Sequence, residues 1–271
     1  MAWLQSHDPF NPEILGLPVI GVASHIGRRD VGFHRHAMGQ LIFTQSGCIR
    51  IKLAKHLCML PPTRAVWIPP HVSHRSEIME VVDYRSIYLD VTQFGALPDR
   101  VEVLEVTPLL RAVLERIATA SFDTDWQNGP AAHLMAVCLD EIRLARREST
   151  LCPLPSDSRL ARMSTHKLPP PLKVLATQVG ASEKTIGRIF RRETGLSYQQ
   201  WRQQWRFLKA IELLAKGERT SAVANALAFS SDSAFVAFFR QMTGLPPRAY
   251  MLFPEKRIFV TTQRSSSETA E

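Results

Sequence analysis

The feature that most constrains the fold of this chain is a segment that occurs twice near its C-terminal end. The tripeptide Thr-Gly-Leu at 194–196 recurs at 243–245, and a Phe-Arg pair precedes each copy, at 190–191 and 239–240. Upstream of these, Ala176 recurs as Ala224 at an offset of 48 residues instead of 49, so the second copy has one extra residue in its turn. Two copies are too few for a solenoid. The sequence therefore predicts two related units joined by one connecting segment.

Each unit is predicted to consist of two short helices around a tight turn. In the first unit Gly180 can adopt the left-handed conformation that ends a helix, and Ser182 can cap the next helix by accepting a backbone N–H. The apolar side of that next helix contains Ile186, Ile189 and Phe190, and the opposite side contains Lys184, Gly187, Arg188 and Arg191. One apolar face and one small or basic face after a glycine turn are typical of a helix-turn-helix.

The second unit repeats this pattern with one departure. Its apolar side contains Phe235, Phe238, Phe239 and Met242, and its outward side contains Ser233, Val236, Ala237 and Arg240. Ala228 stands where the first unit has its turn glycine, and a left-handed alanine costs on the order of 1 kcal/mol. A plain helical bundle is the alternative interpretation, but it does not explain why both outward faces are small or basic.

Over about its last hundred residues the chain resembles the arabinose-regulator (AraC/XylS) family of bacterial transcription factors. The matching residues are Ala176, Ser182, Ile186, Arg188, Phe190, Thr194, Gly195, Leu196, Trp201, Arg206, Ala210, Ala224, Phe229, Ser233, Phe235, Phe239, Gly244, Pro247 and Tyr250. The resemblance implies that a long helix, about residues 198–216, bridges two helix-turn-helix units whose recognition helices enter successive major grooves of duplex DNA. The residues predicted to bind DNA are Ser182, Glu183, Lys184, Gly187, Arg188, Arg191, Arg192, Ser231, Asp232, Ser233, Val236, Ala237 and Arg240.

The distribution of charge agrees with a DNA-binding C-terminal half. The chain has a net charge of +8, and residues 151–271 hold 18 Lys and Arg against 9 Asp and Glu. Residues 1–150 hold 15 Lys and Arg against 16 Asp and Glu, so they are close to neutral. A neutral half joined to a basic half is typical of a sensor attached to a polyanion binder.

The first hundred residues have the pattern of an all-β domain. Short β-rich runs lie at 19–23, 41–44, 48–53, 65–68, 76–79 and 84–89, with Pro-Pro pairs at 61–62 and 69–70. No long helical period interrupts residues 14–106. Many short strands of this kind predict a closed barrel or a double-sheet jelly roll.

Two histidine motifs lie within this region. The first reads H-x-H-x3-Q-x6-G from His34, and the second reads P-x-H-x2-H from position 69. They resemble the two motifs of the cupin barrel, whose metal-binding members use three histidines and a glutamate. His34, His36 and His74 match the histidine positions. Gln40 stands where the acid would be, and His71 stands where glycine is usual.

The histidines have two interpretations. In the first, His34, His36 and His74, with Gln40, hold a divalent transition-metal ion through neutral imidazole nitrogens. In the second, the same residues line a metal-free pocket and hydrogen-bond one another, water or an effector, because regulators of the resembled family commonly bind a small molecule in their barrel. Both interpretations make these four residues the effector pocket. Arg35 is predicted to face away from this pocket as a surface charge.

Two helices and a linker are predicted between the barrel and the repeat. The helices are residues 108–120 and 130–147, and in the resembled family this helix pair commonly forms the dimer contact. One side of the second helix contains Leu134, Val137, Cys138, Glu141 and Ile142, and its end contains Arg143, Arg146 and Arg147, which suit the helix dipole. Pro153 and Pro155 break any helix in the linker. A short helix at 157–164 is predicted to open the DNA-binding domain.

The sequence therefore predicts a regulator with two domains, one β-rich and one α-helical. Residues 1–148 are a cupin-like, effector-sensing and dimerisation domain that includes the helical hairpin, and residues 149–156 are the linker. Residues 157–252 are an AraC-type double helix-turn-helix domain, and residues 253–271 are a tail whose end is predicted to be disordered. The predicted partners are duplex DNA, a small-molecule effector and a second copy of the chain, with RNA polymerase as a further candidate.

This prediction has two alternatives, an architectural DNA-binding protein with an inert barrel and an enzyme. A metal-dependent, dioxygenase-like cupin enzyme with an accessory helical domain would use the same histidines, but the missing acidic ligand counts against it. No run of about eighteen apolar residues occurs, and the four cysteines, Cys48, Cys58, Cys138 and Cys152, form no C-x-x-C pair. We therefore expect a cytoplasmic, non-enzymatic protein with reduced thiols.

Overall fold

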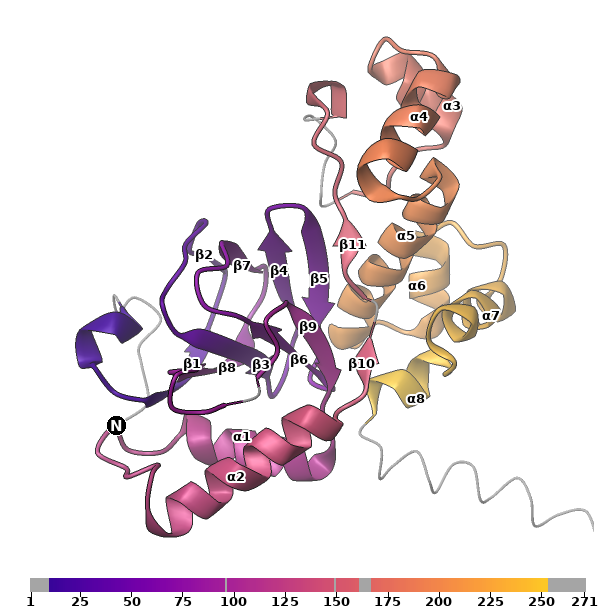
Figure 1. The fold of residues 1–271 in the computed structure, drawn as a ribbon. Coiled ribbons are helices and arrows are strands. Elements are labelled where there is room, and N and C mark those ends of the chain that lie inside the picture. The colour runs from indigo at the N-terminus through magenta and orange to yellow at the C-terminus, as the bar shows by residue number, and fades with distance from the viewer. Residues whose placement is uncertain (1–9, 96, 149, 161–166, 253–271) are drawn as a thin grey trace, which may run out of the picture.

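The computed structural model describes residues 10–95, 97–148, 150–160 and 167–252. In that part of the chain, a short 3₁₀ turn, η1 (Pro12–Leu15), is followed by two antiparallel sheets and a pair of helices. A linker then leads to six further helices, which lie beside the sheets (Figure 1). No helix of the described residues is long and apolar enough to cross a membrane.

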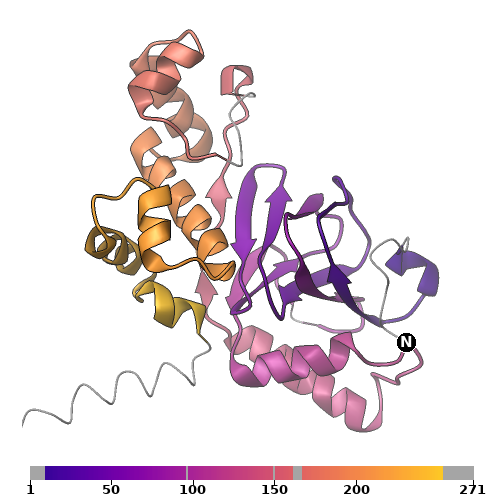
Figure 2. The ribbon, with the colours of Figure 1, turned by 180° about the vertical axis from the view of Figure 1, so that it is seen from behind.

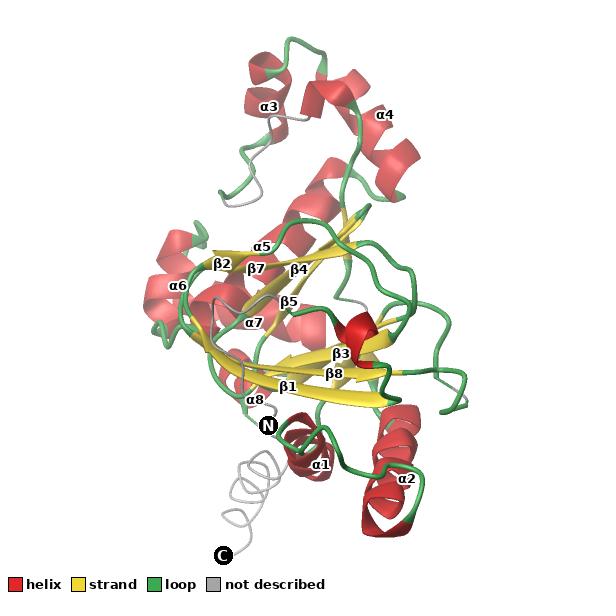
Figure 3. Cartoon of the chain, turned by 90° about the vertical axis from the view of Figure 1, so that its left-hand side faces the viewer, coloured by secondary structure: helices red, strands yellow, loops and turns green. Residues whose placement is uncertain are grey.

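The two sheets contain all the strands of the described residues. The first sheet has the order β1 (Val19–Ile26), β8 (Val82–Leu89), β3 (Gly39–Thr44), β6 (Arg64–Ile68), β9 (Glu102–Glu105) and β10 (Arg147–Glu148). The second has the order β11 (Cys152–Pro153), β5 (His56–Leu60), β4 (Ile49–Leu53), β7 (His74–Ile78) and β2 (Arg29–Asp30). The sheets lie face to face (Figure 3), which confirms the predicted double-sheet architecture.

Each face of the first sheet packs against a different layer. Toward the second sheet, Ile42 and Val66 pack with Ile51 in a fully buried cluster. On the opposite face lie α1 (Pro108–Ala118) and α2 (Gly129–Leu144), as Figure 3 shows. A glycine allows this close layer, because a Cβ atom at Gly21 of β1 would lie 2.3 Å from a backbone carbonyl oxygen of α1. The helical pair is therefore part of the core of the N-terminal domain, which we call the sensor domain after its predicted role.

Among the described strands, the sequence missed β2, β5, β9, β10 and β11, and it placed the end of α2 too late. Strand β5 is rich in Leu, Cys and Met and β9 alternates Glu with Val and Leu, so neither has the β-branched content that marked the other strands. Helix α2 ends at Leu144 instead of 147, so Arg146 lies beyond it and Arg147 belongs to β10. Arg147 still donates to the carbonyl of Arg143 at 2.6 Å, which caps the helix from outside.

The packed side of α2 also differs from the prediction. Met135, Cys138 and Ile142 are its buried residues, whereas Val137 is 40% exposed. Residues 134 and 141 are only half-buried. The helix is therefore rotated relative to the predicted stripe, and Val137 belongs to its outward face.

The linker is hydrogen-bonded to the second sheet. Cys152 and Pro153 form β11, which pairs with β5 at the edge of the second sheet, and the amide of Leu154 donates to the carbonyl of Lys55 at 2.7 Å. Residues Ser158–Leu160 form one 3₁₀ turn, η2. The rest of the predicted helix at 157–164 and the predicted tail lie outside the described residues.

Six helices form the C-terminal group, and they match the predicted repeat. They are α3 (Leu172–Gln178), α4 (Glu183–Thr194), α5 (Tyr198–Ala215), α6 (Thr220–Ala226), α7 (Asp232–Thr243) and α8 (Pro247–Met251). Helices α3 and α4 form the first helix-turn-helix, α6 and α7 form the second, and α5 bridges them (Figure 2). Ser182 and Ser231 cap α4 and α7 by accepting amide N–H groups at 3.1 Å. The predicted Ser182 cap is thus confirmed.

The two turns of the repeat have the same backbone conformation. Gly180 has φ 66°, and Ala228, at the equivalent position, has φ 56°. Both values lie in the left-handed region, where a Cβ atom is unfavourable. The second turn is therefore strained, as the sequence predicted.

Exchanging the residues at these two turns should have opposite effects on stability. Ala228→Gly should raise the free energy of unfolding by about 0.5–1 kcal/mol, because the left-handed strain disappears, and Gly180→Ala should lower it by about 1 kcal/mol. Urea unfolding followed by circular dichroism measures both. A loss of stability in Ala228→Gly would show that the strain is not where the backbone angles place it.

Candidate DNA-binding surface and sensor cavity

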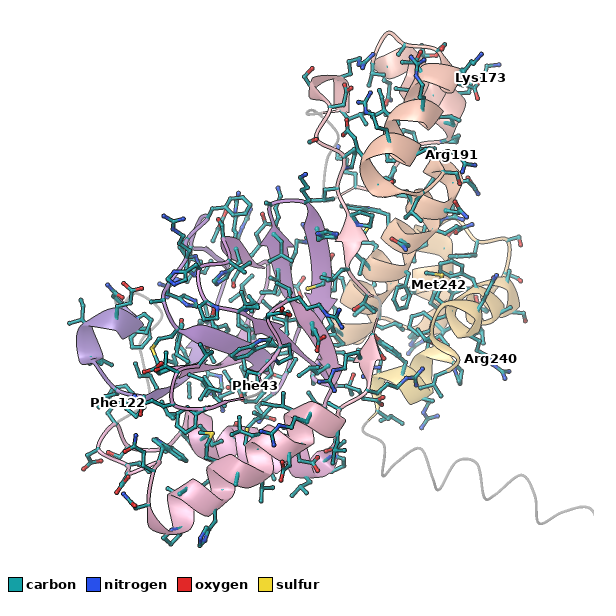
Figure 4. All side chains as sticks on the ribbon, viewed as in Figure 1. Phe43, Phe122, Lys173, Arg191, Arg240 and Met242 are labelled. Atoms are coloured by element: carbon teal, nitrogen blue, oxygen red, sulfur yellow. The ribbon has the colours of Figure 1, made fainter. Side chains whose placement is uncertain are left out.

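The outward face of α4 is exposed and basic. Lys184, Arg188 and Arg191 are exposed on it, next to the cap Ser182 and Glu183, whereas Gly187 is half-buried. Within the described residues the Arg188 guanidinium makes no hydrogen bond or ion pair, so neither Glu183 nor Glu193 holds it. Figure 4 shows Arg191 projecting on the side of the helical group that faces away from the sheets. The Arg188 guanidinium is therefore available to contact a ligand that binds to this face of α4.

Arg192 differs from its neighbours on α4. Its guanidinium lies 2.7 Å from a carboxylate oxygen of Glu193 and 3.6 Å from one of Asp157. Glu193 also accepts the backbone N–H groups of Ser156 and Asp157, at 2.7 and 3.0 Å. The predicted DNA-binding residue Arg192 is thus engaged with the end of the linker, and Glu193 anchors that linker to α4.

The outward face of α7 is less basic than that of α4. Ser231, Asp232, Ser233 and Ala237 are exposed, whereas Val236 is half-buried and packs against the core of the helical group. Arg240 is exposed and projects away from the sheets (Figure 4). Val236 is therefore only partly available to a ligand, in contrast to its predicted outward position.

The second turn is held by a residue of α5. The Arg206 guanidinium donates to the carbonyl of Ala228 at 3.0 Å and lies over the ring of Phe229, 4.7 Å from its centroid. These contacts connect the strained turn to the bridging helix. Arg206, which matched the resembled family, therefore positions the second unit and does not belong to its outward face.

A cavity of about 610 Å³ lies in the sensor domain. Its wall includes η1 and residues of both sheets: Phe10, Asn11, Pro12, Glu13, Val22, Ser24, Ile26, Arg29, Asp30, Val31, His34, Arg35, His36, Gln40, Ser76, Ile78, Tyr84 and Tyr88. Arg35 is exposed, as predicted, but its side chain lines the cavity. The prediction that Arg35 faces away was wrong because residues 34–36 are not a strand, apart from one isolated bridge between His34 and His74.

The three histidines predicted as ligands converge at this cavity. One ring nitrogen of each of His34, His36 and His74 lies within 4.8 Å of the other two. Burial lowers the pKa of His36, and it lowers the pKa of His74 to about 4, so both rings are neutral at pH 7. Their position and neutral state suit a metal ion or a polar organic ligand.

The other two residues of the histidine motifs have separate roles. Gln40 is buried, and its amide N–H donates to the Ser86 hydroxyl at 2.9 Å while its oxygen lies 3.1 Å from Nε2 of His36. His71 is exposed and lies outside the histidine cluster, and its φ of 63° explains why the resembled motif has glycine there. Gln40 therefore belongs to the cluster, and His71 forms a turn.

Sequence reasoning missed the residues that connect the sensor domain to α5. Arg50 of β4 is only 3% exposed and lies 3.1 Å from Glu212 of α5 and 3.5 Å from Glu77 of β7. Lys209 of α5 and Lys216, which directly follows the helix, also contact Glu212, at 2.9 and 3.5 Å. Arg50 and Glu212 are 162 residues apart, and no local pattern could have paired them.

A second polar contact joins the sensor domain to α8. Arg64 of β6 lies over the ring of Tyr250, 4.1 Å from its centroid, and pairs with Glu148 at 2.5 Å. The Tyr250 hydroxyl donates to the same carboxylate at 2.9 Å. Apolar contacts surround these pairs, because Leu57 and Met59 of β5 share one buried cluster with the helices. The two domains are therefore docked through a mixed, largely buried interface.

The relatives of the chain agree with this architecture. Residues 175–252 match the family described as a helix-turn-helix domain. The chain is 28% identical over 223 residues to the HTH-type transcriptional regulator NimR of Escherichia coli strain K12, a match that covers 80% of this chain and 81% of NimR. The chain is a transcriptional regulator of the helix-turn-helix type, and residues 175–252 are its helix-turn-helix domain.

Two further relatives differ in how much of this regulator they match. The uncharacterized HTH-type transcriptional regulator YobQ of Bacillus subtilis strain 168 is 23% identical over 235 residues, which cover 83% of the regulator and 91% of YobQ. The HTH-type transcriptional regulator RipA of Corynebacterium glutamicum is 35% identical over 79 residues, which cover 29% of the regulator and 24% of RipA. The alternative of a cupin enzyme is not supported by these relatives.

The Arg50 contact should make a large and cooperative contribution to stability. Arg50→Met should lower the free energy of unfolding by about 3 kcal/mol, because two buried carboxylates lose their shared partner. Arg50→Met combined with Glu212→Gln should cost less than the sum of the single changes, by at least about 1 kcal/mol. A double-mutant cycle in urea measures this coupling. The exposed pair Arg143–Asp140 is the control, and its coupling should not exceed about 0.5 kcal/mol. Additive effects at Arg50 and Glu212 would contradict the interpretation of the interface.

Proposed function

We propose that this regulator binds promoter DNA as a homodimer, reads the base sequence mainly through α4, and responds to a small molecule held in the sensor cavity. One observation carries the proposal. The exposed faces of α4 and α7 point away from the sensor domain, while α5, which bridges them, is docked on the sheet that forms part of the cavity wall. The DNA-binding helices are thus connected to the cavity wall through α5 and the second sheet.

The two recognition helices have different capacities for base readout. Arg188 of α4 and Ala237 of α7 occupy equivalent positions when the shared phenylalanines are aligned. An arginine can donate two hydrogen bonds to the O6 and N7 edge of guanine, whereas alanine offers only apolar contact, for example to a thymine methyl group. We therefore assign base readout to α4, and phosphate contacts to Arg240 and to the capped N-terminus of α7.

The outward face of the helical pair supplies the dimer contact in this proposal. Leu109 of α1 is 53% exposed, and Val137 and Leu144 of α2 are 40% and 80% exposed. Large apolar side chains on one helical layer are unusual at a monomer surface and suit contact with a second copy.

We expect Val137→Glu combined with Leu144→Glu to shift the chain from dimer to monomer in sedimentation, because each carboxylate would be desolvated in the contact. The buried Met135 should not be changed in this test. A variant that remains dimeric would place the contact elsewhere.

The assignment of α4 gives a test on the full chain. Arg188→Ala should reduce affinity for the preferred DNA by about 1–3 kcal/mol and for random DNA by much less, because a base contact is lost. Arg240→Ala is the matched control, since loss of a phosphate contact should weaken both affinities about equally and lower their dependence on salt. Selection of binding sites from random duplexes, followed by titration at several salt concentrations, measures both effects. If Arg188→Ala selects the same sequences as the unaltered chain while Ala237→Val changes them, base readout belongs to α7.

A further inference from the structure

We propose that the sensor cavity binds its effector through a metal ion, which His34, His36, His74 and Gln40 hold and which an organic anion completes as a further ligand. The ion is a divalent first-row transition metal, since imidazole and amide oxygen are ligands that this class accepts. The inference deepens the sensor function proposed above and rests on it for its regulatory meaning. Binding of the ion and of the anion can nevertheless be measured without DNA.

The three imidazoles are already oriented as metal ligands. In each ring, Nδ1–H donates to a backbone carbonyl two residues away: His34 to Gly32 at 3.2 Å, His36 to Met38 at 2.5 Å and His74 to Val72 at 2.9 Å. A carbonyl can only accept, so in the neutral form of each ring the proton lies on Nδ1 and Nε2 presents a lone pair. Metal-binding histidines typically have their second nitrogen fixed in this way.

One of these lone pairs has no partner. His74 is fully buried, and its Nε2 makes no hydrogen bond. A buried polar atom without a partner is unfavourable and indicates a missing ligand. The converging nitrogens lie within 4.8 Å of one another, whereas two ligands of one zinc-like ion can be at most about 4.2 Å apart, so binding needs side-chain shifts of roughly half an ångström.

Gln40 completes the donor set. Its amide nitrogen donates to Ser86, which turns its oxygen toward Nε2 of His36, 3.1 Å away. Two acceptors therefore face each other across a distance close to the separation of about 3 Å that adjacent ligands have on one ion. A cation shared by both atoms satisfies them. The cavity also contains two carboxylates, but Asp30 pairs with Arg75 and Glu13 accepts the N–H of Ala37.

The charge of the donor set determines the kind of effector. Three neutral imidazoles and one amide carry no charge, so a divalent ion keeps both of its positive charges. A glutamate at position 40 would neutralise one of them. Because uncompensated charge is costly in a buried site, a ligand that brings negative charge to the ion is strongly favoured. Gln40 in place of an acid therefore converts the site into an anion receptor.

The walls of the cavity suit the rest of such a ligand. Val22, Ile26 and Ile78 provide apolar surface, and the volume of about 610 Å³ is in the range that holds a small organic molecule. Arg29 and Arg35 line the same cavity and add positive charge to it. We infer a carboxylate with an apolar body, whose charged end binds the ion.

Co²⁺ and benzoate test this inference on the full chain. The chelator-treated protein should take up about one equivalent of Co²⁺, seen by elemental analysis and by visible absorption of the bound ion. The loaded protein should bind benzoate at least about tenfold more tightly than benzamide, its neutral isostere, with a change in the Co²⁺ absorption. Less than about a tenth of an equivalent of Co²⁺, or equal binding of benzoate and benzamide, would overturn the proposal.

Three variants separate the steps of the argument. His74→Ala should lose Co²⁺ uptake, and the control His71→Gly should retain it, because His71 is exposed, lies outside the cluster and has a backbone conformation that glycine tolerates. Gln40→Glu should keep Co²⁺ but bind benzoate at least about tenfold more weakly, since one charge of the ion is already neutralised. Unchanged benzoate affinity in Gln40→Glu would refute the charge argument.

The outcome can be distinguished from failure of the sensor function. If Co²⁺ and benzoate bind as expected and DNA affinity does not respond to any cavity ligand, the ion and anion site stands and the proposed sensor function is wrong. If a neutral compound binds the metal-free cavity and alters DNA affinity, the sensor function stands and the metal-mediated site is wrong.

Discussion

The docking of α5 on the second sheet is the contact on which the rest of the structure depends. Toward its beginning α5 packs Tyr198 and Trp201 against Phe190 of the first unit, and farther along Phe207 contacts Phe239 of the second. One helix thus fixes the spacing of both recognition helices. Because Arg50 binds Glu212 in a buried site, any other docked position would lose this charge pair between the sheet and the helix.

The strand β7 belongs both to the cavity and to this contact. Ser76 lines the cavity, and the ring of His74, on the same side of the strand, contacts the cavity residues His34 and His36. Glu77 faces Arg50 on the other side, as the twofold period of a strand requires. The adjacent strand β4 pairs with β7 and carries Arg50 itself. Movement of His74 toward a ligand would therefore act on a strand whose opposite face is part of the docked interface.

The sequence predicted correctly those features that depend on residues close together in the chain. Turn glycines, capping serines and helical periodicity predicted both helix-turn-helix units, and the short β-rich runs predicted a closed barrel or a double-sheet fold. The two histidine motifs predicted a cluster because each is read within a few residues. The same rules missed β5 and the strand in the linker, since Leu, Met, Cys and Pro have low strand preference and only tertiary pairing holds them extended.

The contacts between distant segments could not be predicted. Nothing near Arg50 in the sequence indicates Glu212, and nothing near Glu193 indicates that it would hold the linker amides. The position of Arg35 was predicted from regular strand geometry, but residues 34–36 do not form a strand. The position of Val137 was predicted from helical periodicity, but α2 is rotated about its axis relative to the predicted stripe. Tertiary packing decides such positions, and a single sequence does not record it.

The short strand in the linker has a consequence for the DNA that this regulator can use. Since β11 is hydrogen-bonded to β5 and the amides of Ser156 and Asp157 are held by Glu193, the described linker residues 152–157 are fixed to the second sheet and to α4. In a dimer formed by the sensor domains, the distance between the two DNA-binding domains would then be fixed. Inserting about 5 base pairs, half a helical turn, between two half-sites would move one of them to the far side of the duplex, and the fixed linker residues 152–157 could not extend to follow it.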